Sequence, residues 1–297
     1  MIDKLEMFIA LAQARHFGRA AEAVGVTQPT LSAAIKGLED QLGVMLVRRG
    51  SRFQGLTPEG SRALDWARRI VGDARAMREE LRVARGGGGL SGNLRIAAIP
   101  TALSVVARLT ARFAAAHPGV KISVTSSSSA GILAMLDDLA VDAGLTYLEG
   151  EPLGRVVRVP LYDERYVLLL HPDAALAGRT TVTWAEAGAM PLCLLTPVMQ
   201  NRRIIAGHLS EAGAEVAPQV ESDSITVLAG NVMAGGMATI LPDRAARVFT
   251  RDGGLVAVPV VSPDARHPVG LIAPWREPHT PVIAALLAEG RRQAEAL

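Results

Sequence analysis

Short polar side chains gather on one side of the segment GVTQPTLSAAIKGLEDQLG, residues 25–43. The helical spacing of Leu31 and Ile35 predicts that these two residues are buried, which leaves the polar side chains exposed. Hydroxyl, amide and ammonium groups on an exposed helix face suit the base edges and phosphates of a DNA major groove. We therefore predict that this face binds DNA, with the candidate residues Gln28, Pro29, Thr30, Ser32 and Lys36.

The residues before this segment predict a shorter helix that packs against it. Ala20 and Ala21 are small enough for two helices to cross closely, and Gly25 permits the positive φ of a tight turn. Thr27 is suited to cap the start of the longer helix. Together these residues predict a helix-turn-helix, although an ordinary pair of packed helices has the same pattern.

A basic turn follows in LVRRGSRFQGLTPEG. This composition predicts two short strands around the turn, forming a wing whose Arg48, Arg49 and Arg52 neutralise phosphates. The charge distribution agrees, because residues 1–90 hold fourteen Lys and Arg against ten Asp and Glu, whereas the remainder holds seventeen against nineteen. A basic segment joined to a slightly acidic body indicates a polyanion partner for the segment. We assign residues 1–57 to a winged helix-turn-helix domain.

A long helix is predicted next, over residues 58–88, with Thr57 as its cap and Pro58 in its first turn. Its small and apolar residues alternate at spacings of four and three, the heptad pattern of a helix that pairs with another helix. They are Ala63, Ala67, Ile70, Ala74, Met77, Leu81 and Ala84. We predict a homodimer through this linker helix; the alternative is a helix packed on its own domain.

The tract RGGGGLSG, residues 85–92, marks a domain boundary, because four consecutive glycines disfavour a helix. It contains a literal G-x-G-x-x-G, but a dinucleotide site needs that motif after a strand and before a helix. Beyond it, β-rich and helical runs alternate in two series, which predicts an α/β fold of two lobes. We place the third domain at 89–297, with lobe I at about 93–161 and 268–297 and lobe II at about 162–267.

The whole chain resembles the LysR-type transcriptional regulators. The resemblance rests on LEMFIALAQARHFGRAAEAVGVTQPTLSAAIKGLEDQLGVMLVRR, on LTPEG and on GNLRIAAIP. It implies a winged helix-turn-helix, a dimerising linker helix and a two-lobed effector domain like a periplasmic binding protein. It also implies homotetramers that bend promoter DNA and respond to a small co-inducer. RNA polymerase is a candidate further partner.

Two residues depart from the family pattern. Family members often have Arg directly after the Ser of the recognition helix, where this chain has Ala33 after Ser32, so one groove contact is in doubt. Val47 replaces the Phe that is usual in the wing, a change that we expect to affect packing more than DNA binding.

Polar residues follow the predicted strands of both lobes, where parallel α/β folds collect ligands near helix N-termini. The resemblance also implies that hydroxyls matching Thr101 and Ser128 or Ser129 contact the effector. The candidate effector-binding residues are Pro100, Thr101, Ser127, Ser128, Ser129, Thr146, Thr196, Gln200, Asn201 and Arg202, with Arg203 as an alternative anion partner. The hydroxyls could instead be helix caps, and the arginines solvated surface. Since only 4% of residues are aromatic, we predict a small anion, a carboxylate as small as formate.

The alternative class is a solute-binding protein or enzyme on the same two-lobed fold. The sequence contains no H-E-x-x-H, G-x-S-x-G, P-loop or paired Cys and His cluster, so we predict no catalytic residues, metal or cofactor. The single cysteine, Cys193, lies in an apolar run and is expected to be an inert core thiol. The absence of an export signal and of a membrane-spanning run predicts a cytoplasmic protein.

Overall fold

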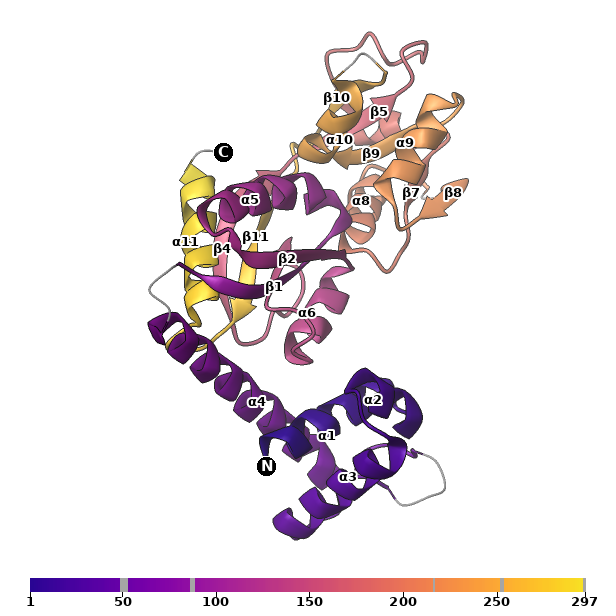
Figure 1. Cartoon of the computed structure of the whole chain (residues 1–297). Coiled ribbons are helices and arrows are strands. Elements are labelled where there is room, and N and C mark those ends of the chain that lie inside the picture. Colours follow the sequence, from indigo (N-terminus) through magenta and orange to yellow (C-terminus); the bar gives the residue numbers. More distant parts are fainter. Residues whose placement is uncertain (49–52, 86–88, 216, 252–253, 296–297) are drawn as a thin grey trace. The chain divides into compact units, whose positions relative to one another are not determined.

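The computed structural model describes residues 1–48, 53–85, 89–215, 217–251 and 254–295 (Figure 1). It divides into two compact units, the first built on Met1–Gly89 and the second on most of Leu90–Leu297. The predicted Arg49 and Arg52 of the wing lie outside the described residues, as does Gly87 of the glycine tract. No helix among the described residues is long and apolar enough to cross a membrane.

The first unit is helical. It contains α1 (Ile2–Ala14), α2 (Phe17–Ala23), α3 (Gln28–Leu42) and α4 (Pro58–Arg85). Its core combines apolar residues from every one of these helices with Leu46 of the wing. The largest fully buried members are Phe8, Leu11, Leu31 and Leu38.

The linker helix α4 begins as predicted, with Pro58 in its first turn and the Gly60 N–H donating to the Thr57 hydroxyl at 2.9 Å. A side chain at residue 60 could not fit, because a Cβ atom there would lie 2.0 Å from the carbonyl oxygen of Leu46. The glycine therefore lets the start of α4 pack directly against the wing.

The predicted heptad stripe of α4 is divided between two environments. Ala67 and Ala74 are buried, and Ala67 belongs to the core of the first unit. This part of α4 therefore packs on its own domain, which was the alternative to pairing with a second helix. Ile70, Met77 and Leu81 are exposed, and so is Trp66 on the same side. Pairing along the stripe stays a prediction, but Ala67 is not available to a partner helix, because α1 and its neighbours cover it together with Leu64 and Val71.

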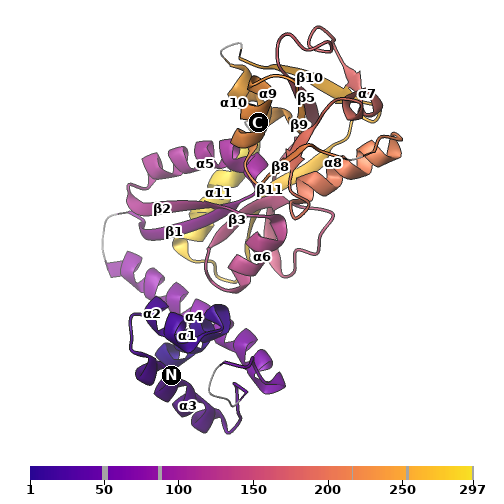
Figure 2. The same cartoon turned by 90° about the vertical axis from the view of Figure 1, so that its right-hand side faces the viewer.

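Lobe I is a five-stranded sheet in the order β2-β1-β3-β11-β4. Its strands are β1 (Ser91–Ala98), β2 (Gly119–Ser126), β3 (Ala143–Tyr147), β4 (Val156–Glu164) and β11 (His267–Pro274). The first three are parallel, and β11 runs antiparallel to β3 and β4. Helices α5 (Leu103–Ala116) and α6 (Ser129–Asp137) lie on opposite sides of this sheet (Figures 1 and 2), and α11 (Pro281–Glu295) completes the core. The parallel βα alternation is as the sequence predicted.

Lobe II contains a four-stranded sheet in the order β6-β10-β5-β9 and a separate pair of strands. The sheet is formed by β5 (Tyr166–Leu170), β6 (Val182–Thr183), β9 (Thr239–Pro242) and β10 (Val256–Val261). The pair is β7 (Cys193–Leu195) with β8 (Val220–Ser222), and the helices are α7 (Trp184–Gly188), α8 (Gln200–Glu211), α9 (Ile225–Met233) and α10 (Asp243–Thr250). The second predicted series consists of the apolar runs RYVLLLH, PLCLLT, APQVES and MATILP and the helical runs 198–211 and 224–234, which correspond to β5, β7, β8, β9, α8 and α9. It does not include β6, α7, α10 or β10.

The chain passes between the lobes at two points, and the first differs from prediction. Strand β4 continues to Glu164, past the expected lobe boundary at residue 161, and Arg165 alone separates it from β5. The longer strand is stabilised by pairing with β11, in which Glu164 is opposite His267. Glu164 therefore lies at the junction of the two lobes.

Candidate functional site

The candidate DNA-binding face of α3 has the burial pattern that its sequence predicts. Leu31 and Ile35 are buried, and Leu38 continues the same apolar side. The candidate residues on the other side are all exposed: Gln28, Pro29, Thr30, Ser32 and Lys36. Ala33, at the position where the family often has Arg, is exposed on this face too. The face is therefore free within the first unit to meet a partner.

Local hydrogen bonds set the start of α3. The Thr30 N–H donates to the Thr27 side chain at 3.4 Å, and the two threonine hydroxyls are 2.8 Å apart. Gly25 has a φ of 70°, as a tight turn before the helix requires. Ala20 and Ala21 are buried where α2 packs in the core. These contacts fix the angle between α2 and α3, and so the direction in which the polar face points.

The wing forms a smaller ladder than the sequence predicted. Among the described residues it consists of an isolated antiparallel bridge between Val47 and Leu56, instead of two short strands. Two backbone hydrogen bonds of 3.0 Å flank the bridge, from the Arg48 N–H to Gly55 and from the Thr57 N–H to Leu46. The Glu39 carboxylate accepts hydrogen bonds from the N–H groups of Leu46 and Val47, at 2.7 and 3.1 Å. Arg48, the described candidate for phosphate contact, is exposed beside this bridge.

Lobe I contributes buried hydroxyls at the carboxyl ends of its strands. Thr101 follows β1 and Thr146 lies near the end of β3, and both are almost fully buried. Their hydroxyl oxygens have no hydrogen-bond partner among the described residues, and the same is true of Ser129 at the start of α6. Such orphaned buried groups are uncommon in proteins unless a ligand or water satisfies them.

Two serines beside this cluster have other environments. Ser128 accepts a hydrogen bond from the Gly131 N–H at 3.1 Å, so the simpler account as a helix cap applies to it. Ser127 is half-buried and donates its N–H to the Ala98 carbonyl at 3.0 Å. Pro100 is buried next to Thr101 and starts a short 3-10 turn, Pro100–Ala102, that sets the direction of the threonine.

Lobe II contributes the N-terminal turn of α8 and the loop before it. Gln200 and Asn201 are buried, and their amide oxygens, like the Thr196 hydroxyl, have no partner among the described residues. Arg202 is also buried; one end of its guanidinium lies 3.5 Å from Glu221, while its Nε has no partner among those residues. Arg203 is different, because it pairs with Glu151 and donates to the carbonyls of Pro197 and Val198. Arg203 therefore holds its own loop in place.

A tyrosine and a glutamate that the sequence analysis missed join these candidates. The Asn201 side-chain N–H donates to the Tyr147 hydroxyl at 3.1 Å, and that hydroxyl donates to the Glu164 carboxylate. Glu164 is fully buried. Burial raises its pKa to about 7, against smaller lowering effects of Tyr147 and Thr101. In the sequence, Glu164 could have been noticed as an acidic residue between two apolar runs, close to the predicted boundary between the lobes.

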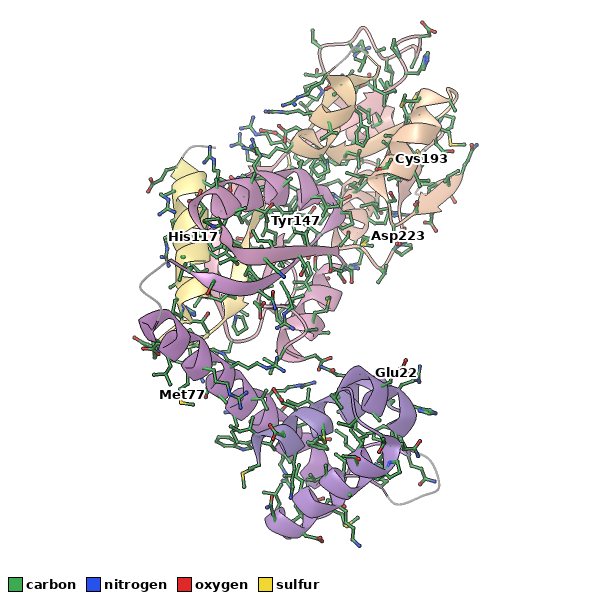
Figure 3. The ribbon with its side chains drawn as sticks, viewed as in Figure 1. Glu22, Met77, His117, Tyr147, Cys193 and Asp223 are labelled. Atoms are coloured by element: carbon green, nitrogen blue, oxygen red, sulfur yellow. The ribbon has the colours of Figure 1, made fainter. Side chains whose placement is uncertain are left out.

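Cys193, by contrast, has the environment of a core thiol. It is fully buried in β7, and its sulfur lies 3.5 Å from the carbonyl oxygens of Leu228 and Ala238. Burial raises the pKa of the thiol. Figure 3 shows its position within lobe II. The described residues also contain no group of three or more His, Cys, Asp or Glu side chains that could hold a metal ion.

Both units match known families. Residues 2–61 match the family described as bacterial regulatory helix-turn-helix protein, lysR family, and residues 87–295 match the LysR substrate binding domain. The DNA-binding transcriptional dual regulator OxyR of Escherichia coli (strain K12) is 32% identical over 272 residues, which cover 91% of this chain and 88% of that protein. An SDS degradation transcriptional activation protein of Pseudomonas sp. is 34% identical over 247 residues, covering 81% and 78%.

Solved structures support the fold. A full-length OxyR variant from Pseudomonas aeruginosa has a TM-score of 0.76 at 24% identity, covering 98% of this chain and 97% of that one. CbnR, described as a LysR family transcriptional regulator, has a TM-score of 0.64 at 24% identity and covers 99% of both chains. A helix-turn-helix domain followed by a two-lobed α/β domain, the fold class predicted from the sequence, is thereby confirmed.

Proposed function

Because this chain belongs to the LysR family of DNA-binding transcriptional regulators, we propose that a small carboxylate effector controls how it binds promoter DNA. In this proposal the exposed face of α3 and the wing contact DNA, and the buried polar residues at the lobe junction contact the effector. The first part rests on the exposed polar side chains of α3, and the second on buried hydroxyl and amide groups that lack partners among the described residues.

The DNA part can be tested by gel shift with the DNA upstream of this chain's own gene. Lys36→Ala should weaken binding of every sequence about equally and reduce the salt slope by about one, as expected for a phosphate contact. Lys121→Ala, which removes an exposed lysine from β2 of the other unit, is the matched control. Equal effects of the two variants, or binding that survives deletion of residues 1–57, would contradict the assignment.

The effector part rests on one observation above all. Both lobes contain buried polar atoms without hydrogen-bond partners in the described part of the chain: the hydroxyls of Thr101, Ser129 and Thr146 in lobe I, and the amide oxygens of Gln200 and Asn201 and the Nε of Arg202 in lobe II. Buried polar groups without hydrogen bonds are destabilising, so a ligand that supplies partners gains affinity from them. Hydroxyl donors and the Nε of Arg202 suit a carboxylate, with formate as the smallest candidate.

Calorimetry against a panel of small acids tests this part, with formate, acetate and glycolate compared with benzoate and a sugar phosphate. We expect a short carboxylate to bind, and Thr101→Val to abolish its binding while DNA binding without effector is retained. Thr125→Val, at an exposed position on β2, should leave both unchanged. Binding of the aromatic acid or sugar phosphate with no binding of short acids would overturn the proposal.

Some relatives are described as hydrogen peroxide-inducible genes activators, among them a probable one from Mycobacterium avium that is 32% identical. A thiol that senses peroxide must be accessible and partly ionised. Cys193 is the only cysteine of this chain; it is fully buried and its thiol pKa is raised. We therefore propose control by a bound ligand instead of thiol oxidation, and we expect Cys193→Ala to keep its effector response.

We further propose that the chain forms homodimers through α4, and that pairs of dimers form homotetramers on DNA. The exposed Trp66, Ile70, Met77 and Leu81 support the dimer, because large apolar side chains on one side of a helix favour a partner helix. Effector binding at the lobe junction would favour one arrangement of the lobes and, through the oligomer, one DNA geometry. Scattering curves of the DNA complex that are identical with and without effector would contradict this mechanism.

A further inference from the structure

The Glu164 carboxylate is half-satisfied at the junction of the lobes. One oxygen, Oε2, accepts the hydrogen bond of Tyr147. The other, Oε1, is buried and has no hydrogen-bond partner among the described residues. The charged residue that acts on it most, Asp243 of α10, is itself acidic and provides no compensation. A buried carboxylate in this state gains strongly from any further donor.

Glu164 is directly linked to the candidate effector residues. The hydroxyls of Thr101 and Tyr162 lie close enough to lower its pKa, although neither forms a hydrogen bond of acceptable geometry with any described residue. On the other side, Tyr147 connects the carboxylate to Asn201, whose amide oxygen is also buried without a partner in the described structure. The junction therefore offers two kinds of group, namely hydroxyls that can donate to an anion and buried oxygens that can accept, those of Glu164 accepting best when its carboxyl is ionised.

We propose that Glu164 is a specificity-determining residue of the effector site, and that it accepts a hydrogen bond from a hydroxyl or amino group on the effector. The inference rests on the proposed effector function and narrows it. The effector is then a small carboxylic acid that carries such a donor, as a hydroxy acid or an amino acid does. Its carboxylate meets the hydroxyls and Arg202, and its donor meets the oxygens of Glu164 and Asn201.

Matched pairs of acids test the specificity by calorimetry on the full chain. In each pair one acid carries a hydroxyl or amino group that the other lacks. The pairs are glycolate and acetate, lactate and propionate, and alanine and propionate. For the wild type we expect at least one donor-bearing acid to bind about ten times more tightly than its partner. Glu164→Gln places an N–H donor where an acceptor is needed, and should reduce that ratio about tenfold. Asp163→Asn, at the adjacent exposed acid, should leave the ratio unchanged.

The pH dependence of the ratio distinguishes recognition from a structural role. A carboxylate accepts more strongly than a protonated carboxyl group, so the wild-type preference should be larger at about pH 8 than at about pH 6, while that of Glu164→Gln should be flat. The other titratable groups around Glu164 should not produce this pH dependence themselves. Tyr147, Tyr162 and Tyr166 have raised pKa values and stay neutral, and burial lowers the pKa of His267 on β11. Asp243 remains as the other acid in the surroundings.

The outcomes separate this inference from the proposed function. If in every pair the unsubstituted acid binds as tightly as its donor-bearing partner, or if Glu164→Gln keeps the wild-type ratio, the role of Glu164 is overturned while carboxylate binding stands. If no acid of either kind binds, the proposed effector class fails and this inference fails with it. A Glu164→Gln chain that does not fold is replaced in the test by Tyr147→Phe, which removes the donor to Oε2 and should alter the same ratio.

Discussion

Replacing Glu164 with Gln should change how the stability of the second unit depends on pH. The pKa of this carboxyl is raised from 4.5 to about 7 by burial. The native state therefore binds a proton more tightly than the unfolded chain, so the stabilisation is present at low pH and is lost as pH rises through about 7. A shift of this size corresponds to roughly 2 to 3 kcal/mol of unfolding free energy between about pH 5 and pH 8.

Equilibrium urea unfolding measures this loss. Trp184 is fully buried in lobe II and reports on the second unit, once the exposed Trp66 and Trp275 are replaced by Phe in every chain compared. The unfolding free energy of the chain with Glu164 should fall by roughly 2 to 3 kcal/mol more than that of the Glu164→Gln variant between about pH 5 and pH 8. The Asp163→Asn chain should behave like its parent. Parallel pH profiles for the parent chain and the Glu164→Gln variant would refute the argument that burial dominates at this site.

Two further changes test the first unit. Gly60→Val should destabilise it by about 3 kcal/mol or more, measured by thermal unfolding, because Cβ would overlap the Leu46 carbonyl; Gly207→Ala, in an open position on α8, should instead be neutral or stabilising by up to about 1 kcal/mol. Replacing exposed Met77 and Leu81 with Ala should weaken the dimer about tenfold or more in sedimentation equilibrium, whereas Val198→Ala, equally exposed in lobe II, should not; an unchanged dimer would show that α4 pairs through other residues.

The sequence predicted best the elements whose own pattern decides their structure. In α3, the apolar spacing, the Thr27 cap and Gly25 act within a few residues, and the structure has each of them as expected. The parallel strands of lobe I were predicted for the same reason, because each apolar run lies between clear turn residues. Strand β10 was missed although it is apolar, because Pro259 within it argues against a central strand.

What the sequence could not provide were partners distant along the chain. Ala67 and Ile70 both belong to the predicted heptad stripe, yet of the two only Ala67 is buried, because α1 covers that side of α4. Tyr147 and Glu164 lie on strands that are not neighbours in the sheet, and only the pairing of β3 and β4 with β11 brings them together near Asn201. The spacing of residues along one helix or strand carries no information about such contacts between distant elements.

The contact between Asn201 and Tyr147 determines which atoms an effector must bind if it is to switch the protein between two states. The Asn201 to Tyr147 contact already joins the lobes, so a ligand that touched lobe I alone would bind equally well to any arrangement of the two lobes. Equal affinity for both states shifts no equilibrium. The atoms still lacking partners among the described residues lie on both sides of the junction, with Thr101 and Glu164 in lobe I and Asn201 in lobe II. A ligand must therefore satisfy atoms of both lobes at once, and variants on either side, Thr101→Val or Asn201→Leu, should abolish the response to effector while DNA binding persists.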